Sequence, residues 1–525
     1  MSSSAYPGGT PRTTQNRETW STRKVFILAA IGSAVGLGNI WRFPYVAYEN
    51  GGGAFIIPYL VALLSAGIPL LFLDYAVGHK FRGSAPLAYR RLHPRAEGLG
   101  WWQVAICFVI AVYYAVIIAW AAMYMIFSVT EAWGDDPAGF FLGEFLQVSE
   151  NVNIGFDFVP GVLIPLVLVW AVVLLVLAAG VQKGIGRANV IFLPLLLVMF
   201  LLLVVQALFL PGAGEGLDAL FRPDWAALAD TGVWAAAFGQ IFFSLSVAFG
   251  IMVTYASYLK RKTDLTGSGY VVAFSNSGFE ILAGIGVFAA VGFMAHSAGA
   301  PVGEVAGSGG IGLAFIAFPT IISEAPLGTL LGVLFFGSLV FAGLTSLISI
   351  VEVIIAAVQD KLGLRRLTAT LAVGLPLAAL SILLFPTTTG LNLLDVTDAF
   401  VNNFGIMAVA LVTVVLLTYG LRALPLLGSH VNETSSIKLA RGWRIMVGVV
   451  APVVLGYILV NELIGRIQEG YNDMPAWFVG VFGWGMAGAL VVVAIILSLI
   501  PWSSRSAANH PVLDAGTNAG KEAAR

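Results

Sequence analysis

The sequence predicts an all-α polytopic membrane protein with twelve transmembrane helices. Of its 525 residues, 58% are hydrophobic and 10% are charged, whereas soluble globular chains have about 25% charged residues. The mean hydropathy is +0.90, which is typical of membrane proteins. Apolar runs long enough to cross a bilayer, which takes about 20 residues, follow one another along nearly the whole chain.

We expect each of twelve apolar runs to form one span, with polar loops between them. The runs lie at 24–48, 54–78, 100–133, 159–180, 188–210, 234–259, 270–296, 327–358, 367–386, 392–421, 443–465 and 476–501. The segment 302–325 also has apolar pieces, and we expect it to be a partly buried outer loop.

The distribution of positive charge predicts the orientation. Arg42, Arg222 and Arg466 are the basic residues on one side of this map, and all other Lys and Arg residues fall on the opposite side. An excess of Lys and Arg marks the cytoplasmic side, so both termini are expected in the cytoplasm, with the chain in the plasma (inner) membrane. The formal net charge of −1 gives no indication of a nucleic-acid partner, and the single cysteine, Cys107, excludes an internal disulfide.

Two apolar runs are interrupted by residues with low helix propensity. Residues 32–42, GSAVGLGNIWR, contain three glycines, each of which costs roughly 1 kcal/mol of helix propensity relative to alanine. Residues 240–250, QIFFSLSVAFG, contain two serines, a glutamine and a glycine. On the first stretch alone, the GxxxG pattern of Gly32 and Gly36 indicates close helix packing about as well as a break.

The second stretch favours the interpretation as broken helices. The two interruptions lie in the first and sixth spans, five spans apart and in opposite orientation, which predicts an inverted repeat of five plus five helices. Unwound backbone within a membrane persists only where it lines a protein-enclosed or wet cavity. The expected division is a tail at 1–22, a first repeat at 23–211, an outer loop at 212–233, a second repeat at 234–422, helices 11 and 12 at 423–502, and a tail at 503–525.

Several motifs resemble the neurotransmitter:sodium symporter family. They are NRETW at 16–20, GSAVGLGNIWRFPY and ENGGGAFIIPY in the first two spans, VWAAAFGQIFFSLSVAFG and VTYASY around the sixth, and FAGLTS in the eighth. The resemblance covers nearly the whole chain. It implies the LeuT-type fold, with broken helices 1 and 6 and with helices 11 and 12 appended, and sodium-coupled transport by alternating access.

The resemblance also implies two sodium sites. The first would use Ala34, Asn39, Ser244 and Asn276, and the second would use Gly32, Val35, Ala342, Thr345 and Ser346. These residues offer carbonyl, amide and hydroxyl oxygens, which are neutral hard ligands suited to an alkali cation. For Thr345 and Ser346 a hydrogen bond to a carbonyl of their own helix is the alternative role.

The implied substrate site lies between the two breaks. Its residues would be Ser33, Ala34, Leu37, Gly38, Ile110, Tyr114, Phe243, Ser244, Ser246, Phe249, Ser346, Ser349 and Ile350. By this resemblance, Gly36 stands at the position where family members that carry monoamines have an Asp. With no acid there, we expect the substrate to bring its own carboxylate, and the mostly apolar lining favours a neutral, hydrophobic or aromatic L-amino acid. For Ile110 and Ile350, ordinary helix packing is the alternative.

Charged residues on either side of this site resemble the gates of the family. Arg42 and Asp398, with Phe249 as a lid, would form the outer gate. The inner gate would be formed by Arg17, Asp360 and Tyr258. The alternative is that these are unrelated interfacial charges.

Three further acids lie within predicted spans. Asp74 is expected to be structural, and Glu352 is either a second partner for Arg17 or a proton carrier. Glu280 lies one helical turn after Asn276, where its negative charge would replace the chloride of chloride-dependent members, so chloride is not expected to be required. Glu280 either binds a proton when the site empties, which would give proton antiport, or stays ionised through hydrogen bonds.

Other functional classes are less well supported. The chain has five His and neither an HExxH nor a GxSxG motif, so an enzyme is not expected. A passive channel would not require matched broken helices, and a transport-inactive amino-acid sensor of the same fold remains an alternative. The expected partners are therefore an amino-acid substrate, two sodium ions and the lipid bilayer.

Overall fold

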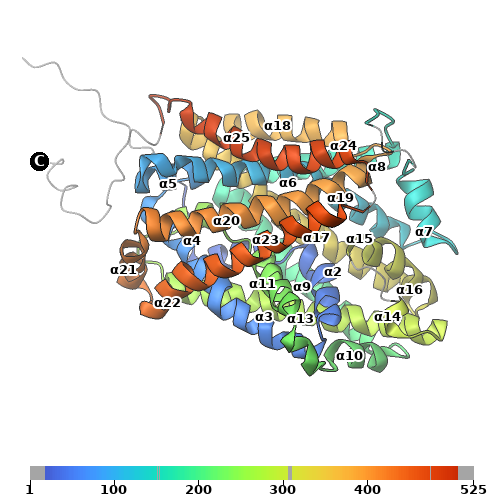
Figure 1. Cartoon of the computed structure of the whole chain (residues 1–525). Coiled ribbons are helices and arrows are strands. Elements are labelled where there is room, and N and C mark those ends of the chain that lie inside the picture. Colours follow the sequence, from blue (N-terminus) through green and yellow to red (C-terminus); the bar gives the residue numbers. More distant parts are fainter. Residues whose placement is uncertain (1–17, 150–151, 153, 306–309, 473, 507–525) are drawn as a thin grey trace, which may run out of the picture.

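The computed structural model describes residues 18–149, 152, 154–305, 310–472 and 474–506, and its regular elements there are helices that run lengthwise beside one another (Figure 1). Ten of these helices are long and apolar enough to cross a membrane, or eleven if the bent pair at the start of the chain counts as one span. Several spans include short π-helical turns that leave the helix continuous.

The helices within long apolar segments have the following bounds: α1 (Arg23–Ala34), α2 (Leu37–Glu49), α3 (Ile56–Ala62), α4 (Ile68–Phe81), α6 (Glu97–Phe127), α8 (Pro160–Ala178), α9 (Arg187–Leu208), α11 (Thr231–Ser244), α12 (Ile251–Ser257), α13 (Leu265–Ala298), α17 (Gly328–Leu362), α18 (Arg366–Leu384), α19 (Gly390–Phe400), α20 (Met407–Val415), α22 (Arg441–Ile445), α23 (Ala451–Glu469), α24 (Ala476–Phe478) and α25 (Met486–Leu499). The connections contain α5 (Ala85–Leu92), α7 (Pro137–Gly139), α10 (Ala213–Phe221), α14 (Val302–Val305), α15 (Gly310–Gly312), α16 (Phe318–Glu324) and α21 (Leu424–Thr434).

Most predicted spans coincide with helices, and two predictions differ from the structure. The third span ends at Phe127 rather than at residue 133, where the Ser128 hydroxyl donates to the Tyr124 carbonyl at 2.7 Å. The sixth run is divided into α11 and α12, which agrees with the interruption predicted for this run. The predicted outer loop at 302–325 contains helices, because Phe315 and Phe318 are fully buried among aromatic rings.

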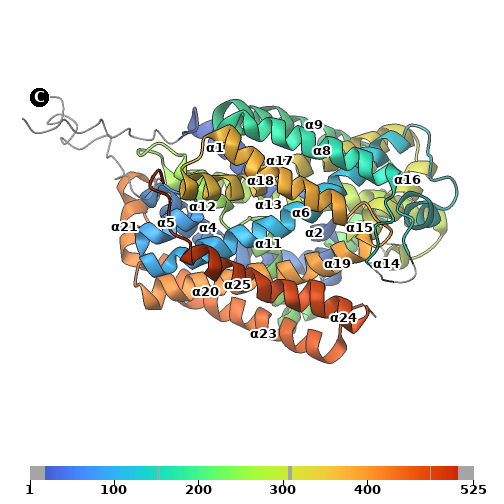
Figure 2. The ribbon, with the colours of Figure 1, turned by 90° about the horizontal axis from the view of Figure 1, so that it is seen from above.

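Burial separates a central layer from a lipid-facing periphery. In the most apolar 18-residue stretch of each span, the buried share of residues is 89% for α17 and 83% for the span containing α6. It is only 22% for the span containing α25 and 28% for the span containing α23. Figure 2 shows α8 and α9 at one edge of the molecule, α23 and α24 at the opposite edge, and α6 between them. The exposed faces of the peripheral helices carry Leu, Ile and Val, as expected of surfaces that contact acyl chains.

The two ends of the helix bundle differ in the elements that cover them. α5 and α21 lie at one end, and α7, α10 and α14 lie at the other (Figure 1). Following the predicted orientation, we call these the inner end and the outer end. The breaks in the first and sixth runs lie between them, and they position the candidate site.

Candidate functional site

The first helix is broken at Val35 and Gly36, and the two halves are bent by 55°. Both residues have extended backbone, so the N–H groups that follow lack helical partners. The Asn39 side chain accepts a hydrogen bond from the Gly36 N–H at 2.9 Å, and the Tyr114 hydroxyl accepts one from the Leu37 N–H at 3.4 Å. The predicted broken first helix is therefore confirmed, and polar side chains satisfy its exposed backbone.

Gly36 is closely packed against two hydroxyl groups. A Cβ atom there would lie 3.0 Å from the Ser346 Oγ and 3.3 Å from the Tyr114 hydroxyl. The backbone of the break therefore lies directly against α6 and α17.

The second break comprises residues 245–250, between α11 and α12. Ser246, Ala248 and Gly250 have φ values of +52°, +66° and +91°. For residues with a side chain this left-handed backbone costs about 1–3 kcal/mol and is found mainly where the surroundings impose it. The buried carboxylate of Asp74 accepts a hydrogen bond from the Ala248 N–H at 2.9 Å, so α4 holds the unwound segment in place, consistent with the structural role expected of Asp74.

The two breaks meet at the carbonyl of Ser33, near the end of α1. This oxygen accepts hydrogen bonds from the Ser246 hydroxyl at 3.2 Å and from the Ser346 hydroxyl at 3.4 Å. Segments more than 200 residues apart in the sequence thus converge on one backbone oxygen.

The side chains predicted for the first sodium site form a connected polar chain. The Asn39 Nδ2 donates to the Asn276 Oδ1 at 2.9 Å, and the Asn276 Nδ2 donates to the Ser244 Oγ at 3.0 Å. All three side chains are buried, and Ala34 lies at the end of α1 beside the same break. Three helices and three neutral polar side chains therefore meet in an apolar surrounding.

Glu280 extends this polar chain by one helical turn of α13. The carboxylate is fully buried, its Oε1 accepts a hydrogen bond from the Gln240 Nε2 at 2.6 Å, and its Oε2 accepts one from the Tyr59 hydroxyl. A buried carboxyl group therefore lies beside the predicted sodium ligands, and two hydrogen-bond donors would stabilise its ionised form.

The residues predicted for the second sodium site lie where α1 faces α17. A Cβ at Gly32 would be 3.4 Å from the Cβ of Thr345, so the two helices are in close contact there. The Thr345 hydroxyl donates to the carbonyls of Phe341 at 3.1 Å and Ala342 at 3.0 Å, which is the within-helix bond expected as the alternative role. One of its two acceptors, the Ala342 carbonyl, is itself a predicted ligand, so the hydroxyl and carbonyl oxygens lie adjacent.

The predicted substrate residues come from the same elements. The Phe243 ring packs on Gly38 so closely that a Cβ there would lie 2.3 Å from a ring carbon. Ile110 and Ile350 are buried on α6 and α17. Ser349 donates to the carbonyls of Thr345 and Ser346 in its own helix, at 2.9 and 2.8 Å.

The outer gate residues lie near each other without forming an ion pair among the described residues. The guanidinium of Arg42 lies 4.8 Å from the centre of the Phe243 ring. Asp398 accepts hydrogen bonds from the Tyr113 hydroxyl at 2.6 Å and from the Asn402 amide at 2.9 Å. The aromatic ring beneath Arg42 is thus that of Phe243, whereas Phe249 is buried and its carbonyl accepts a hydrogen bond from Cys107 at 3.2 Å.

At the inner end, Arg17 lies outside the described residues. Asp360 accepts a hydrogen bond from the Ser84 N–H at 2.7 Å, and the Tyr258 hydroxyl donates to Glu352 at 2.7 Å. Glu352 also forms a two-pronged ion pair with Arg366, at 2.8 and 2.5 Å, and is fully buried. The sequence interpretation missed Arg366, although a buried acid indicates a basic partner, and Arg366 begins the next span.

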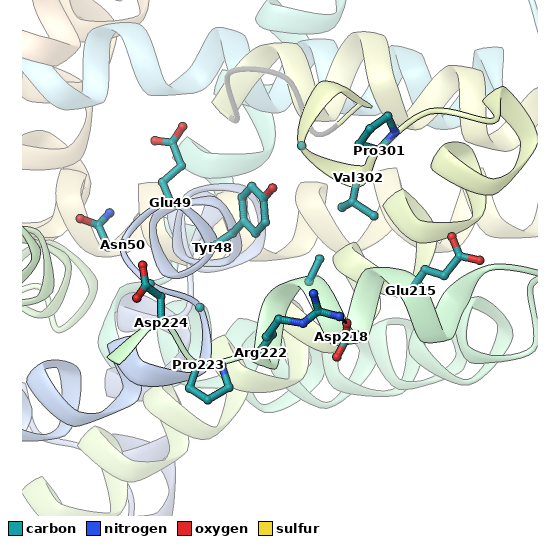
Figure 3. Close-up of a pocket in the computed structure, with 14 residues that line it drawn as sticks. Tyr48, Glu49, Asn50, Glu215, Asp218, Arg222, Pro223, Asp224, Pro301 and Val302 are labelled. Carbon is teal, nitrogen blue, oxygen red and sulfur yellow. Dashed lines mark hydrogen bonds and ion pairs between the residues drawn. The ribbon is translucent and has the colours of Figure 1, made fainter. Parts of the chain in front are cut away.

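An open pocket of about 890 Å³ lies elsewhere, at the outer end between α2, α10 and α14 (Figure 3). Glu49, Glu215, Asp218 and Asp224 line it, and Arg222 pairs with Asp218. None of the predicted site residues lines this pocket. The candidate site is defined instead by its buried polar side chains and its two interrupted helices.

Comparisons with known proteins point to the same family as the motifs around the two breaks. The model described as the sodium:neurotransmitter symporter family matches residues 17–136 and 134–505. The chain is 43% identical over 482 residues to an uncharacterized sodium-dependent transporter of Methanocaldococcus jannaschii, covering 92% of this chain and 97% of the relative.

Two animal relatives are more distant. The chain is 29% identical to the sodium- and chloride-dependent glycine transporter 2 of Xenopus laevis, over 92% of this chain and 69% of the relative. It is 30% identical to the sodium- and chloride-dependent neutral and basic amino acid transporter B(0+) of Mus musculus, over 93% and 86%.

The hydrogen bond from Ala248 to Asp74 gives a first prediction. Asp74→Leu removes the acceptor and leaves a buried N–H unpaired, which should lower the free energy of unfolding by about 1–3 kcal/mol. Asp74→Asn keeps an acceptor oxygen and is the matched control. We expect the Leu variant to have the lower thermal midpoint in detergent, and equal midpoints for the two variants would contradict this role.

The ion pair between Glu352 and Arg366 gives a second prediction. Arg366→Met leaves a buried carboxylate unpaired and should destabilise the protein by about 3–5 kcal/mol. The double variant Arg366→Met with Glu352→Leu removes both charges and should recover much of the loss. Thermal unfolding of the three proteins measures this, and a double variant as unstable as the single one would show that the pairing is not the cause.

Proposed function

Because this chain belongs to the sodium:neurotransmitter symporter family of multi-pass membrane transporters, we propose that it imports a neutral L-amino acid with sodium. The observation that supports this most directly is the convergence of two interrupted helices on Ser33, beside the polar chain of Asn39, Asn276 and Ser244. Broken helices in membrane transporters provide free backbone carbonyls for cations and free N–H groups for carboxylates.

The proposed architecture is the LeuT-type fold with twelve spans. α11 and α12 together form the sixth span, just as α1 and α2 form the first, and the two repeats cover 23–211 and 234–422. Both termini lie in the cytoplasm in this proposal, because nearly all Lys and Arg residues fall on that side of the predicted spans.

Two sodium ions are transported in the proposed cycle. The first ion would bind oxygens of Ala34, Asn39, Ser244 and Asn276, which are already grouped by hydrogen bonds. The second would bind between α1 and α17, at the carbonyls of Gly32, Val35 and Ala342 and the hydroxyls of Thr345 and Ser346. Neutral oxygens suit a monovalent cation because no counter-charge has to be desolvated with it.

The substrate in this proposal is a neutral amino acid with a hydrophobic or aromatic side chain. The N–H groups of Leu37 and Gly38 and the Tyr114 hydroxyl would hold its carboxylate, since Gly36 supplies no acid to the site. The names of two relatives, a glycine transporter and a neutral and basic amino acid transporter, support an amino acid as the substrate but not a particular side chain.

We propose that Phe243, rather than Phe249, closes the site from outside. Its ring lies between Gly38 and the guanidinium of Arg42. Closure would bring Arg42 to Asp398, which Tyr113 and Asn402 hold in place. The inner gate in this proposal comprises Arg17, Asp360 and Tyr258. The Tyr258 hydroxyl donates a hydrogen bond to Glu352, and the ion pair with Arg366 fixes the position of that carboxylate.

Glu280 supports a transport cycle that does not need chloride. Two sodium ions and a zwitterionic substrate add net positive charge, which a fixed carboxylate beside Asn276 offsets. The hydrogen bonds from Tyr59 and Gln240 stabilise the ionised form, whereas complete burial of the carboxyl group favours the protonated form, so proton antiport and a permanently ionised Glu280 both stay as alternatives.

Two other functions predict different behaviour. A transport-inactive sensor would bind the amino acid without moving it, and a channel would show no counterflow of labelled substrate against unlabelled substrate. Counterflow in proteoliposomes distinguishes the proposed carrier from both.

Sodium dependence is the main test of the proposal. Purified protein in liposomes should accumulate a neutral amino acid when sodium is present outside, and should fail to do so in potassium. Asn39→Ala removes a ligand oxygen and should lower the apparent sodium affinity about tenfold, whereas Ile110→Val changes only packing volume and should leave it nearly unchanged. Equal uptake in both salts would overturn sodium coupling.

Chloride dependence tests the role of Glu280. Replacing chloride by gluconate should leave wild-type uptake unchanged. Glu280→Ser leaves the donors of Tyr59 and Gln240 around a space without its negative charge, so uptake by this variant should require chloride. The exposed Glu324→Ser is the control and should remain independent of chloride. A wild type that needs chloride, or a fully active Glu280→Ser in gluconate, would contradict the charge-balance argument.

A further inference from the structure

A buried amide on α9 has a side-chain oxygen without a partner. Asn189 is fully buried, and its Nδ2 donates to the Ile185 carbonyl at 2.9 Å. Only an N–H can donate to a carbonyl, so this bond fixes which end of the amide is the oxygen. The Oδ1 has no hydrogen-bond partner among the described residues.

This oxygen faces α1 at Gly32. A Cβ added to Gly32 would lie 2.3 Å from the Asn189 Oδ1, and the same Cβ would lie 3.4 Å from the Cβ of Thr345. The absence of a side chain at Gly32 is therefore what lets the amide approach the α1 backbone. Asn189, Gly32 and Thr345 belong to three helices, α9, α1 and α17, and they converge at one point.

The position and chemistry of the oxygen suit a cation. An unpaired carbonyl oxygen is costly to bury in a membrane interior, and a bound ion or water is the partner that would satisfy it. A neutral amide oxygen is a hard ligand of the type that binds alkali and alkaline-earth cations. Nothing in the described surroundings of the oxygen donates a hydrogen bond to it, whereas two predicted sodium-binding residues adjoin it.

We propose that Asn189 is a further ligand of the second sodium site, which brings α9 into the ion-binding machinery. This inference rests on the proposed function, because it requires that sodium binds between α1 and α17. In the sodium-bound protein the Asn189 Oδ1 contacts the ion, and its Nδ2 stays bonded to the Ile185 carbonyl. The fifth predicted span is then held to the first and eighth through sodium.

Thermal unfolding of the purified full-length protein, titrated with sodium in a potassium background and without substrate, tests this. A ligand at free concentration c that binds the folded state stabilises it by RT ln(1 + c/Kd), so the sodium concentration that gives a stabilisation of fixed size reports the affinity without any transport. Asn189→Leu should raise that concentration at least tenfold, and Asn189→Asp, which keeps an oxygen in place, should leave it unchanged or lower it. Gln206→Leu, an amide-to-leucine change on the same helix near its outer end, is the matched control and should keep the wild-type value.

The outcomes separate the possible failures. A lower midpoint in potassium, with no change in the sodium concentration needed for that stabilisation in Asn189→Leu, would show that Asn189 only packs against Gly32, and would overturn the inference. If Asn189→Leu cannot be purified, Asn189→Ala compared with Asn189→Asp gives the same decision. A wild type whose midpoint does not respond to sodium would instead overturn the proposed function, whatever the variants do.

Discussion

The structure depends on satisfying backbone polar groups where two helices are interrupted inside the bundle. In a bilayer an unpaired N–H or carbonyl is costly, and water is not available to compensate. The Gly36 N–H is bonded by Asn39, the Leu37 N–H by Tyr114 and the Ala248 N–H by Asp74. The Ser33 carbonyl accepts from Ser246 and Ser346. These bonds come from α2, α4, α6 and α17, so the breaks determine how the surrounding helices must pack.

The same side chains connect the backbone of the breaks to the proposed ion site. Asn39 bonds the Gly36 N–H through its oxygen and the Asn276 oxygen through its nitrogen. Each amide oxygen has two lone pairs and can accept a further partner. A cation that enters there would therefore alter groups that hold the first break and α13 together. Alternating access requires such a link between ion binding and helix position, because a ligand shifts a conformational equilibrium only through differential contacts.

Sequence patterns predicted much of this architecture, because apolar length and helix-breaking residues act locally. The spans, the break at Val35 and Gly36, and the interruption near Ser246 all follow from residues close together in the chain. The pairing of Glu352 with Arg366 and the placement of Phe243 beneath Arg42 depend on how separate helices rotate against each other. The partnerless oxygen of Asn189 was likewise not predictable, since an isolated Asn in an apolar run gives no indication of which helix it faces. The ends of the third span were missed because hydropathy continues beyond Phe127, where the Ser128 hydroxyl bonds the last turn.

The central claim is that one site between the two breaks binds sodium and substrate together. Equilibrium binding of radioactive ²²Na⁺ to the purified protein, with and without a neutral amino acid, measures this claim directly. Coupling between sites is reciprocal, so the amino acid must raise sodium affinity by the same factor by which sodium raises amino-acid affinity. We expect tighter sodium binding in the presence of substrate. Sodium binding that does not respond to any neutral amino acid would contradict a shared site.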